Sequence, residues 1–378
     1  MQKLKVAIYG QTTEGYKLAA RLVDKASVTL IDETLQMATE VDQRFIKSHP
    51  DLDELMSSET LMDLKPIEGA LADANVIFFT PKLRRPSEES LIESTSKLRD
   101  LSRYVSKGTT VVNALPTGPG GNSENMVLLE KQTGLTIGES LEYAYTPLHP
   151  RSAEPAIVAS ASGGKDGQPL EALGLKLNSK SVSAAEHWYV SDVLLGAVKL
   201  ASEIELGKRA REAKVEFQAG GDDVYLDEFS PHLYELKAIQ SSDEAGESIS
   251  YLAGTAVKSF ENYVRYVVDE AREMLKEKEL KASRTRIVVL WNLDKYEMRA
   301  ERLQMAESIV QRLRDYVSDV DSVSGPNLSA GSEILDSQKH NLVIVCSKGD
   351  REIANQSRKN SRGVGVSLLS ATPDLRRE

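Results

Sequence analysis

The 378-residue sequence predicts an α/β protein with a parallel sheet at each end and a helical section between them. In the first and last thirds of the chain, short β-branched runs alternate with helix-patterned segments, which is typical of βαβ units. Between about Glu186 and Lys281, two long helical patterns follow each other without a β-run. These changes of pattern predict domains at residues 1–183, 184–282 and 283–378.

The first third opens with a strand-like run, LKVAIYG, and GYKLAARLVD then carries apolar residues at helical spacing. Further strands are expected at ASVTLIDE, which closes on Asp32, at ADANVIFFTPK and at TTVVNALP. The segment ESLIESTSKLRDLSRYVSKG predicts a helix that ends at Gly108, where glycine can take the left-handed cap conformation. The expected product is a parallel sheet covered by helices.

The middle section predicts two long helices, HWYVSDVLLGAVKLASEIELGKRAREAKVEF and YLAGTAVKSFENYVRYVVDEAREMLKEKEL. The last third predicts a second, smaller α/β domain. Its expected strands are RIVVLWN, NLVIVCSKG and GVGVSLLSA, and its expected helix is AERLQMAESIVQRLRDYVS. The segment SVSGPNLSAGSE predicts an exposed loop between elements.

Composition excludes several classes of function. The formal net charge of −10 disfavours nucleic acid as the main partner. The single cysteine, Cys346, lies in an apolar run and is expected to be buried, and one cysteine rules out an internal disulfide framework. No run approaches the ~18 apolar residues that cross a membrane, and the N-terminus lacks a signal-peptide pattern. We therefore expect a cytoplasmic protein without a membrane partner.

A turn between the first strand and the first helix, VAIYGQTTEG, resembles the start of a dinucleotide-binding domain. Gly10 permits a tight turn and Gly15 permits close packing of the helix on the sheet. Thr12 stands where a glycine usually lets the backbone approach a pyrophosphate, although a hydroxyl can donate to phosphate. Asp32 ends the second strand, where an acid binds the ribose 2′-hydroxyl and favours NAD. The expected NAD-binding residues are Gly10, Thr12, Thr13, Gly15, Asp32 and Thr80. An empty Rossmann-like domain is the alternative.

A longer stretch, GTTVVNALPTGPGGNSENMVLLEKQTGLTIGESLEYAYTPLHPRSAEPAIVAS, resembles the end of the cofactor domain of UDP-glucose and GDP-mannose dehydrogenases. That family has a Thr-Val-Pro-Pro-Gly turn, a helix, a Gly-Leu-x-x-Gly-Glu segment and a Tyr-Ser-Pro-Glu strand end. FENYVRYVVDEAREMLKEKEL followed by RIVVLWNLDKY resembles the entry into its UDP-binding domain. The resemblance implies an N-terminal Rossmann-like domain, a central helical dimerisation domain and a smaller C-terminal Rossmann-like domain, with NAD as cofactor and a nucleotide sugar as substrate.

The residues that carry the family's chemistry are changed. The family forms a thioester on a cysteine, and GGDDVYLDE places Asp223 at that position. Leu148 replaces the glutamate of Tyr-Ser-Pro-Glu. Thr117 lies next to the position of the turn threonine, and Lys199 matches the helical lysine in one of two alignments. The four-electron oxidation of the family is therefore not expected.

Three residues remain as catalytic candidates. Lys199 can take or give the proton of a reacting hydroxyl while hydride moves to the nicotinamide, provided that burial lowers its pKa. A solvated lysine on an amphipathic helix is the alternative. His149, at the end of a predicted strand, can supply an acid or base, or it is a loop histidine. Thr117 is the third candidate. In the third domain, Arg299 or Arg302 can contact a diphosphate, or serve as polar helix surface.

Other residues bear on metals and on assembly. The acidic cluster Asp222, Asp223, Asp227 and Glu228 could hold a hard cation, but a solvated loop is favoured and no metal site is expected. By resemblance, the central helices form a homodimer. The apolar residues assigned to this dimer are Tyr251, Leu252, Val257, Phe260, Tyr263, Val264, Val267 and Val268.

Two functions follow from these observations. The first is an NAD-dependent oxidoreductase that performs a single two-electron step on a nucleotide sugar or a related small hydroxy substrate. The second is a non-catalytic descendant that serves as a nucleotide-binding scaffold, assembly or sensing subunit. Loss of several catalytic positions favours the second, whereas Gly10, Gly15 and Asp32 favour cofactor binding in either case.

Overall fold

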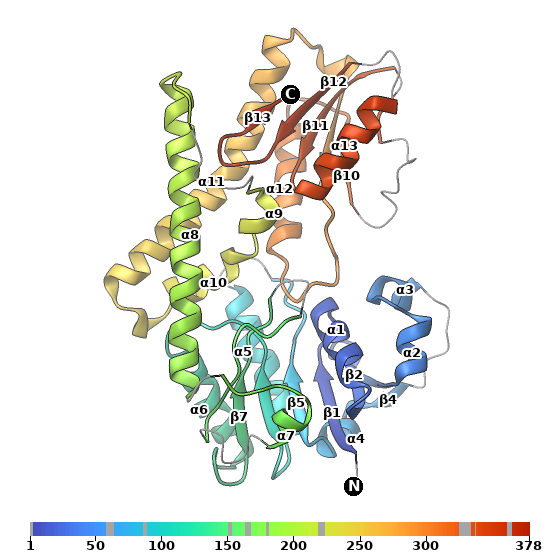
Figure 1. Ribbon diagram of the computed structural model, residues 1–378, viewed down its shortest axis with the longest axis vertical. Coiled ribbons are helices and arrows are strands. Elements are labelled where there is room, and N and C mark those ends of the chain that lie inside the picture. The colour runs from blue at the N-terminus through green and yellow to red at the C-terminus, as the bar shows by residue number, and fades with distance from the viewer. Residues whose placement is uncertain are drawn as a thin grey trace. The chain divides into compact units, whose positions relative to one another are not determined.

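The computed structural model describes residues 3–57, 64–85, 89–149, 153–162, 168–178, 181–217, 224–324, 334–336, 338–360 and 365–378. The chain divides into two compact units (Figure 1). The first unit contains Met1–Val193, Lys237–Ser250 and Tyr296–Ala300. The second contains Leu194–Leu236, Tyr251–Lys295 and Glu301–Glu378. The three-domain division stays a prediction.

The first unit is built on an eight-stranded sheet with the order β4-β3-β2-β1-β5-β6-β7-β8. Its strands are β1 (Leu4–Tyr9), β2 (Ala26–Asp32), β3 (Met37–Val41), β4 (Leu64–Pro66), β5 (Val76–Phe79), β6 (Thr110–Asn113), β7 (Glu142–Tyr145) and β8 (Ala159–Ser160). The central five, β2-β1-β5-β6-β7, pair in parallel, and antiparallel strands extend both edges. All residues of β5, β6 and β7 are buried, as expected for parallel strands covered on both faces.

Helices connect these strands. They are α1 (Thr13–Leu22), α2 (Gln43–Ser48), α3 (Leu52–Ser57), α4 (Ile67–Ala72), α5 (Glu89–Ser102), α6 (Gly121–Thr133) and α7 (Gln168–Ala172). The chain moves from β1 to β2 in one direction and from β5 to β6 and β7 in the other. Right-handed connections therefore place α1 on one face and α5 and α6 on the opposite face. The carboxyl ends of β1 and β5 mark the point of reversal, where doubly wound sheets bind ligands.

The second unit contains a five-stranded sheet with the order β10-β9-β11-β12-β13. Its strands are β9 (Thr285–Leu290), β10 (Val320–Val323), β11 (His340–Val345), β12 (Val366–Ser370) and β13 (Arg376–Arg377), the last one antiparallel. Its helices are α9 (Leu226–Phe229), η2 (Ala282–Arg284), α12 (Glu301–Arg314) and α13 (Lys348–Asn360). The strand order reverses between β9 and β11.

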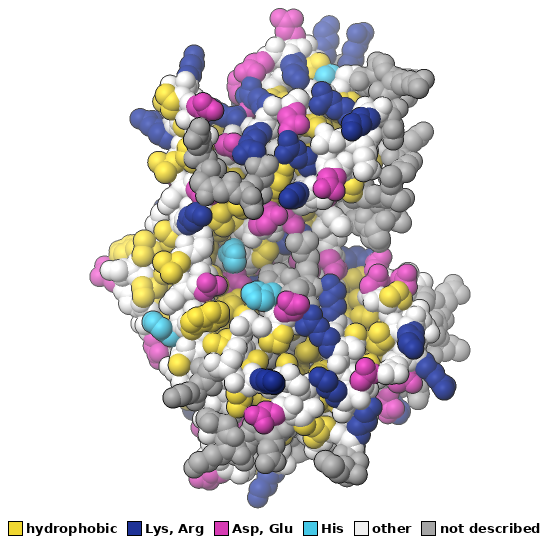
Figure 2. All heavy atoms as spheres, viewed as in Figure 1, with side chains coloured by type: hydrophobic (Ala, Val, Ile, Leu, Met, Phe, Trp, Pro, Cys, Tyr) yellow, Lys and Arg dark blue, Asp and Glu magenta, His cyan; other side chains and the backbone are white. Residues whose placement is uncertain are grey.

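Three helices have residues in both units: α8 (Val182–Glu212), α10 (His232–Gln240) and α11 (Glu247–Glu277). A short 3-10 helix, η1 (Asp243–Ala245), precedes α11. α8 and α11 each have 31 residues, which confirms the two long helices predicted for the middle of the chain. Within the described ranges, every helix is too short or too polar to cross a lipid bilayer. On the face shown in Figure 2, basic and acidic side chains are interspersed.

The predicted fold class is confirmed: the chain is an α/β protein with a parallel-rich N-terminal sheet and a smaller C-terminal sheet. Two predicted helix ends were wrong: α8 ends at Glu212 rather than at Phe217, and α5 ends before Gly108. α5 ends at Ser102, because residues 103–105 form tight turns back to residues 100–102 instead of helical hydrogen bonds. Gly108 does adopt a positive φ of 85°, but it turns the chain into β6 and does not cap the helix. The predicted loop SVSGPNLSAGSE begins inside β10, and its residues 325–333 lie outside the described ranges.

Candidate functional site

The turn between β1 and α1 requires glycine at two positions. Gly10 has a φ of +131°, and a Cβ atom there would lie 1.8 Å from the carbonyl oxygen of Thr80. A Cβ atom on Gly15 would lie 2.8 Å from the carbonyl oxygen of Gly10. Since both contacts are with backbone, neither position accepts a side chain without a shift of the chain. The β1, α1 and β5 elements therefore approach each other closely, which is the role of glycines in dinucleotide-binding turns.

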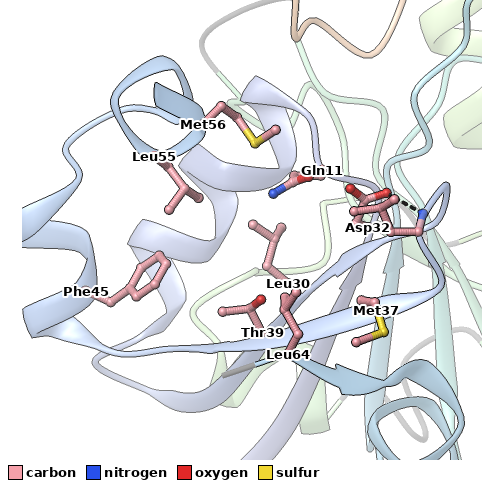
Figure 3. Close-up of a pocket in the computed structure, with 10 residues that line it drawn as sticks. Gln11, Leu30, Asp32, Met37, Thr39, Phe45, Leu55, Met56 and Leu64 are labelled. Carbon is pink, nitrogen blue, oxygen red and sulfur yellow. Dashed lines mark hydrogen bonds between the residues drawn. The ribbon is translucent and has the colours of Figure 1, made fainter. Parts of the chain in front are cut away.

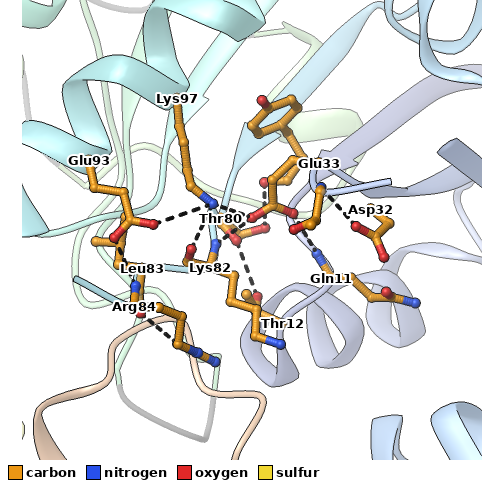
Figure 4. Close-up of polar contacts among 12 residues, drawn as sticks. Gln11, Thr12, Asp32, Glu33, Thr80, Lys82, Leu83, Arg84, Glu93 and Lys97 are labelled. Carbon is orange, nitrogen blue, oxygen red and sulfur yellow. Dashed lines mark hydrogen bonds and ion pairs between the residues drawn. The ribbon is translucent and has the colours of Figure 1, made fainter. Parts of the chain in front are cut away.

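Thr12 caps the first helix from inside the fold. Its side chain is fully buried, and its Oγ1 accepts from the Gly15 N–H at 3.1 Å and donates to the Thr80 carbonyl at 3.3 Å. The Thr80 hydroxyl in turn donates to the Tyr9 carbonyl at 3.3 Å. Figure 4 shows Thr12 and Thr80 directed toward each other. Both hydroxyls bind carbonyls of the fold, and their contact with a phosphate stays a prediction.

A segment between β9 and α12 contacts the first turn of α1. We call this segment, Tyr296–Ala300, the strap; it belongs to the first unit. The Thr13 N–H donates to the Tyr296 carbonyl at 2.8 Å, and the Met298 N–H donates to the Glu14 carboxylate at 2.9 Å. Met298 is fully buried. The strap thus occupies the Thr13 amide, which is of the kind that binds a pyrophosphate at a helix N-terminus.

Glu33 joins the glycine turn to the segment after β5. Its carboxylate is almost buried, and it accepts from the Lys82 N–H at 2.8 Å, the Lys97 ammonium at 3.0 Å and the Gln11 N–H at 3.4 Å. These contacts form the centre of the polar cluster in Figure 4. A carboxylate at this position holds negative charge beside the start of α1, where a phosphate would otherwise be favoured.

Two basic residues after β5 adjoin this cluster. Burial lowers the pKa of Lys82, and the neighbouring Arg84 lowers it further, whereas Glu33 opposes the shift. The Lys82 ammonium lies 5.1 Å from the centre of the Tyr296 ring. Burial also lowers the pKa of Arg84, and the nearby Glu14 opposes it most. The basic side chains are therefore embedded among carboxylates and the strap.

Asp32 lies at the rim of a pocket at the carboxyl end of β2 (Figure 3). Its Oδ1 accepts from the N–H groups of Thr34 and Leu35 at 2.8 and 3.0 Å, which fixes the turn into β3. The pocket has a volume of about 300 Å³. It is lined by Gln11, Leu30, Asp32, Leu35, Met37, Thr39, Phe45, Leu55, Met56 and Leu64. Apolar walls with a few polar groups are typical of small-molecule sites.

A second polar network surrounds Thr117. The Thr117 hydroxyl donates to the Glu186 carboxylate at 3.1 Å and accepts from the Asn122 amide at 2.8 Å. Glu186 also accepts from the N–H groups of Gly120 and Asn122, at 2.5 and 2.9 Å. Glu186 and Asn122 are buried, and Tyr143 donates to Asn122 at 2.6 Å. A carboxylate of the chain therefore occupies the positive end of α6.

Solved structures share this architecture. The UDP-D-ManNAc dehydrogenase from Pyrococcus horikoshii has a TM-score of 0.58 and 15% identity, covering 89% of this chain and 88% of that chain. The UDP-glucose dehydrogenase from Pyrobaculum islandicum has a TM-score of 0.58 and 15% identity, covering 97% and 94%. The UDP-N-acetyl-mannosamine dehydrogenase from Staphylococcus aureus has a TM-score of 0.54 and 13% identity, covering 90% and 88%.

This chain has the nucleotide-sugar dehydrogenase fold. No protein-family model matches the sequence, and no curated protein matches it. At identities of 13–15%, the likeness is one of fold, and the chemistry has to be argued from the side chains.

The remaining catalytic candidates of the dehydrogenase fold are spread over the chain. Lys199 is exposed on the part of α8 that belongs to the second unit. His149 is exposed four residues after β7, in the first unit, and its N–H donates to the Glu154 carbonyl at 2.9 Å. Asp223, which stands at the family's cysteine position, lies outside the described residues, as does Asp222. The roles of Lys199, Thr117 and His149 stay predictions.

The corresponding edge of the second unit is filled by side chains. Asp227 on α9 donates its N–H to the Cys346 carbonyl, and its carboxylate accepts from Trp291 at 2.7 Å and from Arg302. Arg302 is 2% exposed and Trp291 fully buried. Arg302 is thus paired within the unit, whereas Arg299 lies in the strap. Cys346 is buried as predicted, and burial raises the pKa of its thiol.

Sequence reasoning missed Glu33, the strap and the role of Glu186. Glu33 directly follows Asp32, so an acidic pair at a strand end was a usable signal. Glu186 is the fifth residue of the long helix α8, but the Thr117 turn that it holds is distant in the sequence. The strap lies between β9 and α12, and nothing local indicates that it packs in the first unit.

Proposed function

We propose that this chain is a nucleotide-binding protein that keeps the dehydrogenase fold without the oxidation chemistry, and that it acts as a scaffold, assembly or sensing component. The Glu186 network is the observation that supports the loss of the oxidation chemistry. Thr117 is the one catalytic candidate at the family's turn, and its hydroxyl and the adjoining α6 amides are held by a buried carboxylate. Because these hydrogen bonds hold the Thr117 hydroxyl within the fold, we infer that it stabilises the turn and does not contact a reacting sugar.

NAD is the nucleotide that the proposal names first. Gly10 and Gly15 retain the close turn, and Asp32 stands at the end of β2 where an acid accepts from a ribose hydroxyl. The proposed binding residues are Gly10, Thr12, Thr13, Gly15, Asp32 and Thr80. The diphosphate of NAD would compete with the strap for the Thr13 amide.

A two-electron oxidoreductase acting on a nucleotide sugar is the second candidate. Its support is limited: Lys199 and His149 are exposed and therefore accessible to a substrate, but Lys199 lacks the burial that its catalytic role requires. In that reaction the alcohol loses a hydride to NAD⁺ and a proton to a general base, for which Lys199 or His149 is the candidate.

Calorimetric titration with NAD⁺ and NADH tests nucleotide binding. We expect Asp32→Ala to weaken binding at least tenfold. Asp24→Ala, which makes the same charge change two residues before the opposite end of β2, should leave it unchanged. Lack of NAD⁺ and NADH binding at millimolar concentration would refute NAD as the nucleotide. Formation of NADH with any nucleotide sugar, abolished by Lys199→Ala, would replace the proposal with the second candidate.

We also propose a homodimer, but only some of its contact side chains are those that the sequence predicted. Six of the eight apolar residues assigned to it, from Val257 to Val268, are buried within the chain itself. Tyr251 and Leu252 on α11 are 69% and 47% exposed, and Leu195 and Leu206 on α8 are 74% and 58% exposed. These side chains are the proposed contact. Sedimentation equilibrium should give a dimer that Leu195→Asp converts to monomer, and a wild-type monomer at micromolar concentration would contradict it.

A further inference from the structure

We infer that the pocket beside Asp32 binds an uncharged nucleoside, and that the strap and Glu33 make the site select nucleosides over dinucleotides. This inference rests on the proposed nucleotide binding and adds the class of ligand. It depends on two neighbouring features of the first unit: an open apolar pocket, and a turn whose phosphate-binding amides already have partners.

The pocket has the size and the lining for a heterocyclic base. Figure 3 shows Phe45 from α2, Leu55 from α3 and Leu30 from β2 directed toward a common space. Its volume of about 300 Å³ lies at the small end of ligand sites. Leu35, Met56 and Leu64 at its edges are 65%, 43% and 45% exposed, so the opening is apolar surface that a base would cover. Aromatic and aliphatic walls stack a base without requiring charge.

Asp32 and Gln11 are polar groups of the pocket that lie where the ribose of a bound nucleoside would be. Asp32 and Gln11 lie at the rim next to the glycine turn (Figure 3). The turn hydrogen bonds of Asp32 use Oδ1, and Oδ2 accepts no hydrogen bond from the described residues. A carboxylate oxygen with free lone pairs binds a vicinal diol as an acceptor. The Gln11 side-chain amide can donate or accept at the same edge.

The next position, where a diphosphate would lie, is occupied. The Thr13 N–H is bonded to the Tyr296 carbonyl, and the Gln11 N–H points to Glu33 at 3.4 Å. Glu14 brings a second buried carboxylate to the first turn of α1, bonded to the Met298 N–H. A diphosphate would have to displace the strap and approach two carboxylates, whereas a nucleoside meets neither.

Calorimetric titration of the wild-type chain with adenosine, AMP and NAD⁺ tests the inference. We expect adenosine to bind at least tenfold more tightly than NAD⁺, with AMP between them, and Phe45→Ala to weaken adenosine at least tenfold. NAD⁺ binding more tightly than adenosine would overturn the inference and leave the proposed nucleotide binding intact. Absence of binding by all three would overturn both.

The strap is tested by a matched pair of variants. Met298→Ala, which removes a fully buried side chain of the strap, should raise NAD⁺ affinity at least fivefold and leave adenosine affinity unchanged. Met305→Ala, a buried methionine of α12, should change neither. Should Met298→Ala not fold, hydrogen exchange of residues 296–300 in the wild-type chain gives the answer. Exchange that rises with NAD⁺ but not with adenosine supports the strap's role, and exchange unchanged by bound NAD⁺ refutes it.

Discussion

The two sheets reverse their strand order in the same way, but the carboxyl ends of their central strands are built differently. In the first unit, β1 and β5 end at Gly10 and Thr80, next to an open pocket. In the second, β9 and β11 end beneath α9, where Asp227, Arg302 and Trp291 fill the space. Topology marks both edges as ligand positions. The side chains at each edge determine whether a ligand can bind there.

The largest expected effect tests whether the Asp227–Arg302 pair stabilises the carboxyl ends of β9 and β11 in the second unit. Asp227→Ala leaves Arg302 buried without its carboxylate, which should lower the free energy of unfolding by about 3–5 kcal/mol. Urea unfolding measures this. Asp321→Ala, in the exposed pair with Arg286, should cost only about 0–1 kcal/mol. A loss below 1 kcal/mol for Asp227→Ala would mean that the pair does not hold this edge together.

The next effect tests the close turn of the first edge. Gly10→Ala forces a Cβ atom against the Thr80 carbonyl at a positive φ, which should lower the free energy of unfolding by about 3 kcal/mol. Gly69→Ala is the matched control, since its Cβ meets no atom within 4 Å in helix α4, and it should stabilise the chain by about 0.5–1 kcal/mol. Equal effects would show that the turn is not close-packed.

A pH-dependent effect also distinguishes the edges. Asp350 follows β11, is 1% exposed, and burial raises its pKa to about 6. Because the folded-state pKa exceeds the unfolded value of about 3.9, this group stabilises the fold below about pH 4, and that contribution is lost as pH rises to about 6. The Asp350→Asn variant has no carboxyl to ionise at this position, so its stability does not fall for this reason as the pH rises. Its free energy of unfolding relative to wild type should therefore rise by about 2–3 kcal/mol between about pH 4 and pH 7. A constant difference would contradict the assignment.

The smallest effect concerns Thr12. Removal of its capping hydroxyl in Thr12→Ala should lower the free energy of unfolding by about 1 kcal/mol, as for other helix N-caps. Adenosine affinity should not change, because the hydroxyl faces Thr80 rather than the pocket. Thr95→Ala on the exposed side of α5 is the control for stability. A loss of adenosine binding in Thr12→Ala would place the hydroxyl in the site.

Local patterns were enough to predict the central strands and the glycine turn. Gly10, Gly15 and Asp32 were found from spacing, since strand, turn and helix are adjacent in sequence. The short antiparallel strands β3, β4, β8 and β13 were missed, because two to five residues at a sheet edge give little periodicity. The end of α5 was misplaced because a glycine in a left-handed conformation also serves a turn.

Contacts between distant segments account for the rest. The strap reaches the first turn of α1 from a position after β9, and Glu186 reaches α6 from the start of α8. Neither contact leaves a local signature, since each residue is an ordinary member of its own segment. The same holds for Arg302. Its place on a predicted helix indicated a surface residue, but in the structure it pairs with Asp227 of α9.

A crystal structure of the chain grown with saturating adenosine tests the central claim most directly. The account predicts the base between Leu30, Phe45 and Leu55, the ribose hydroxyls on Asp32, and an unchanged hydrogen bond from Thr13 to Tyr296. An empty pocket at saturating adenosine, or adenosine bound elsewhere with the strap displaced, would contradict it.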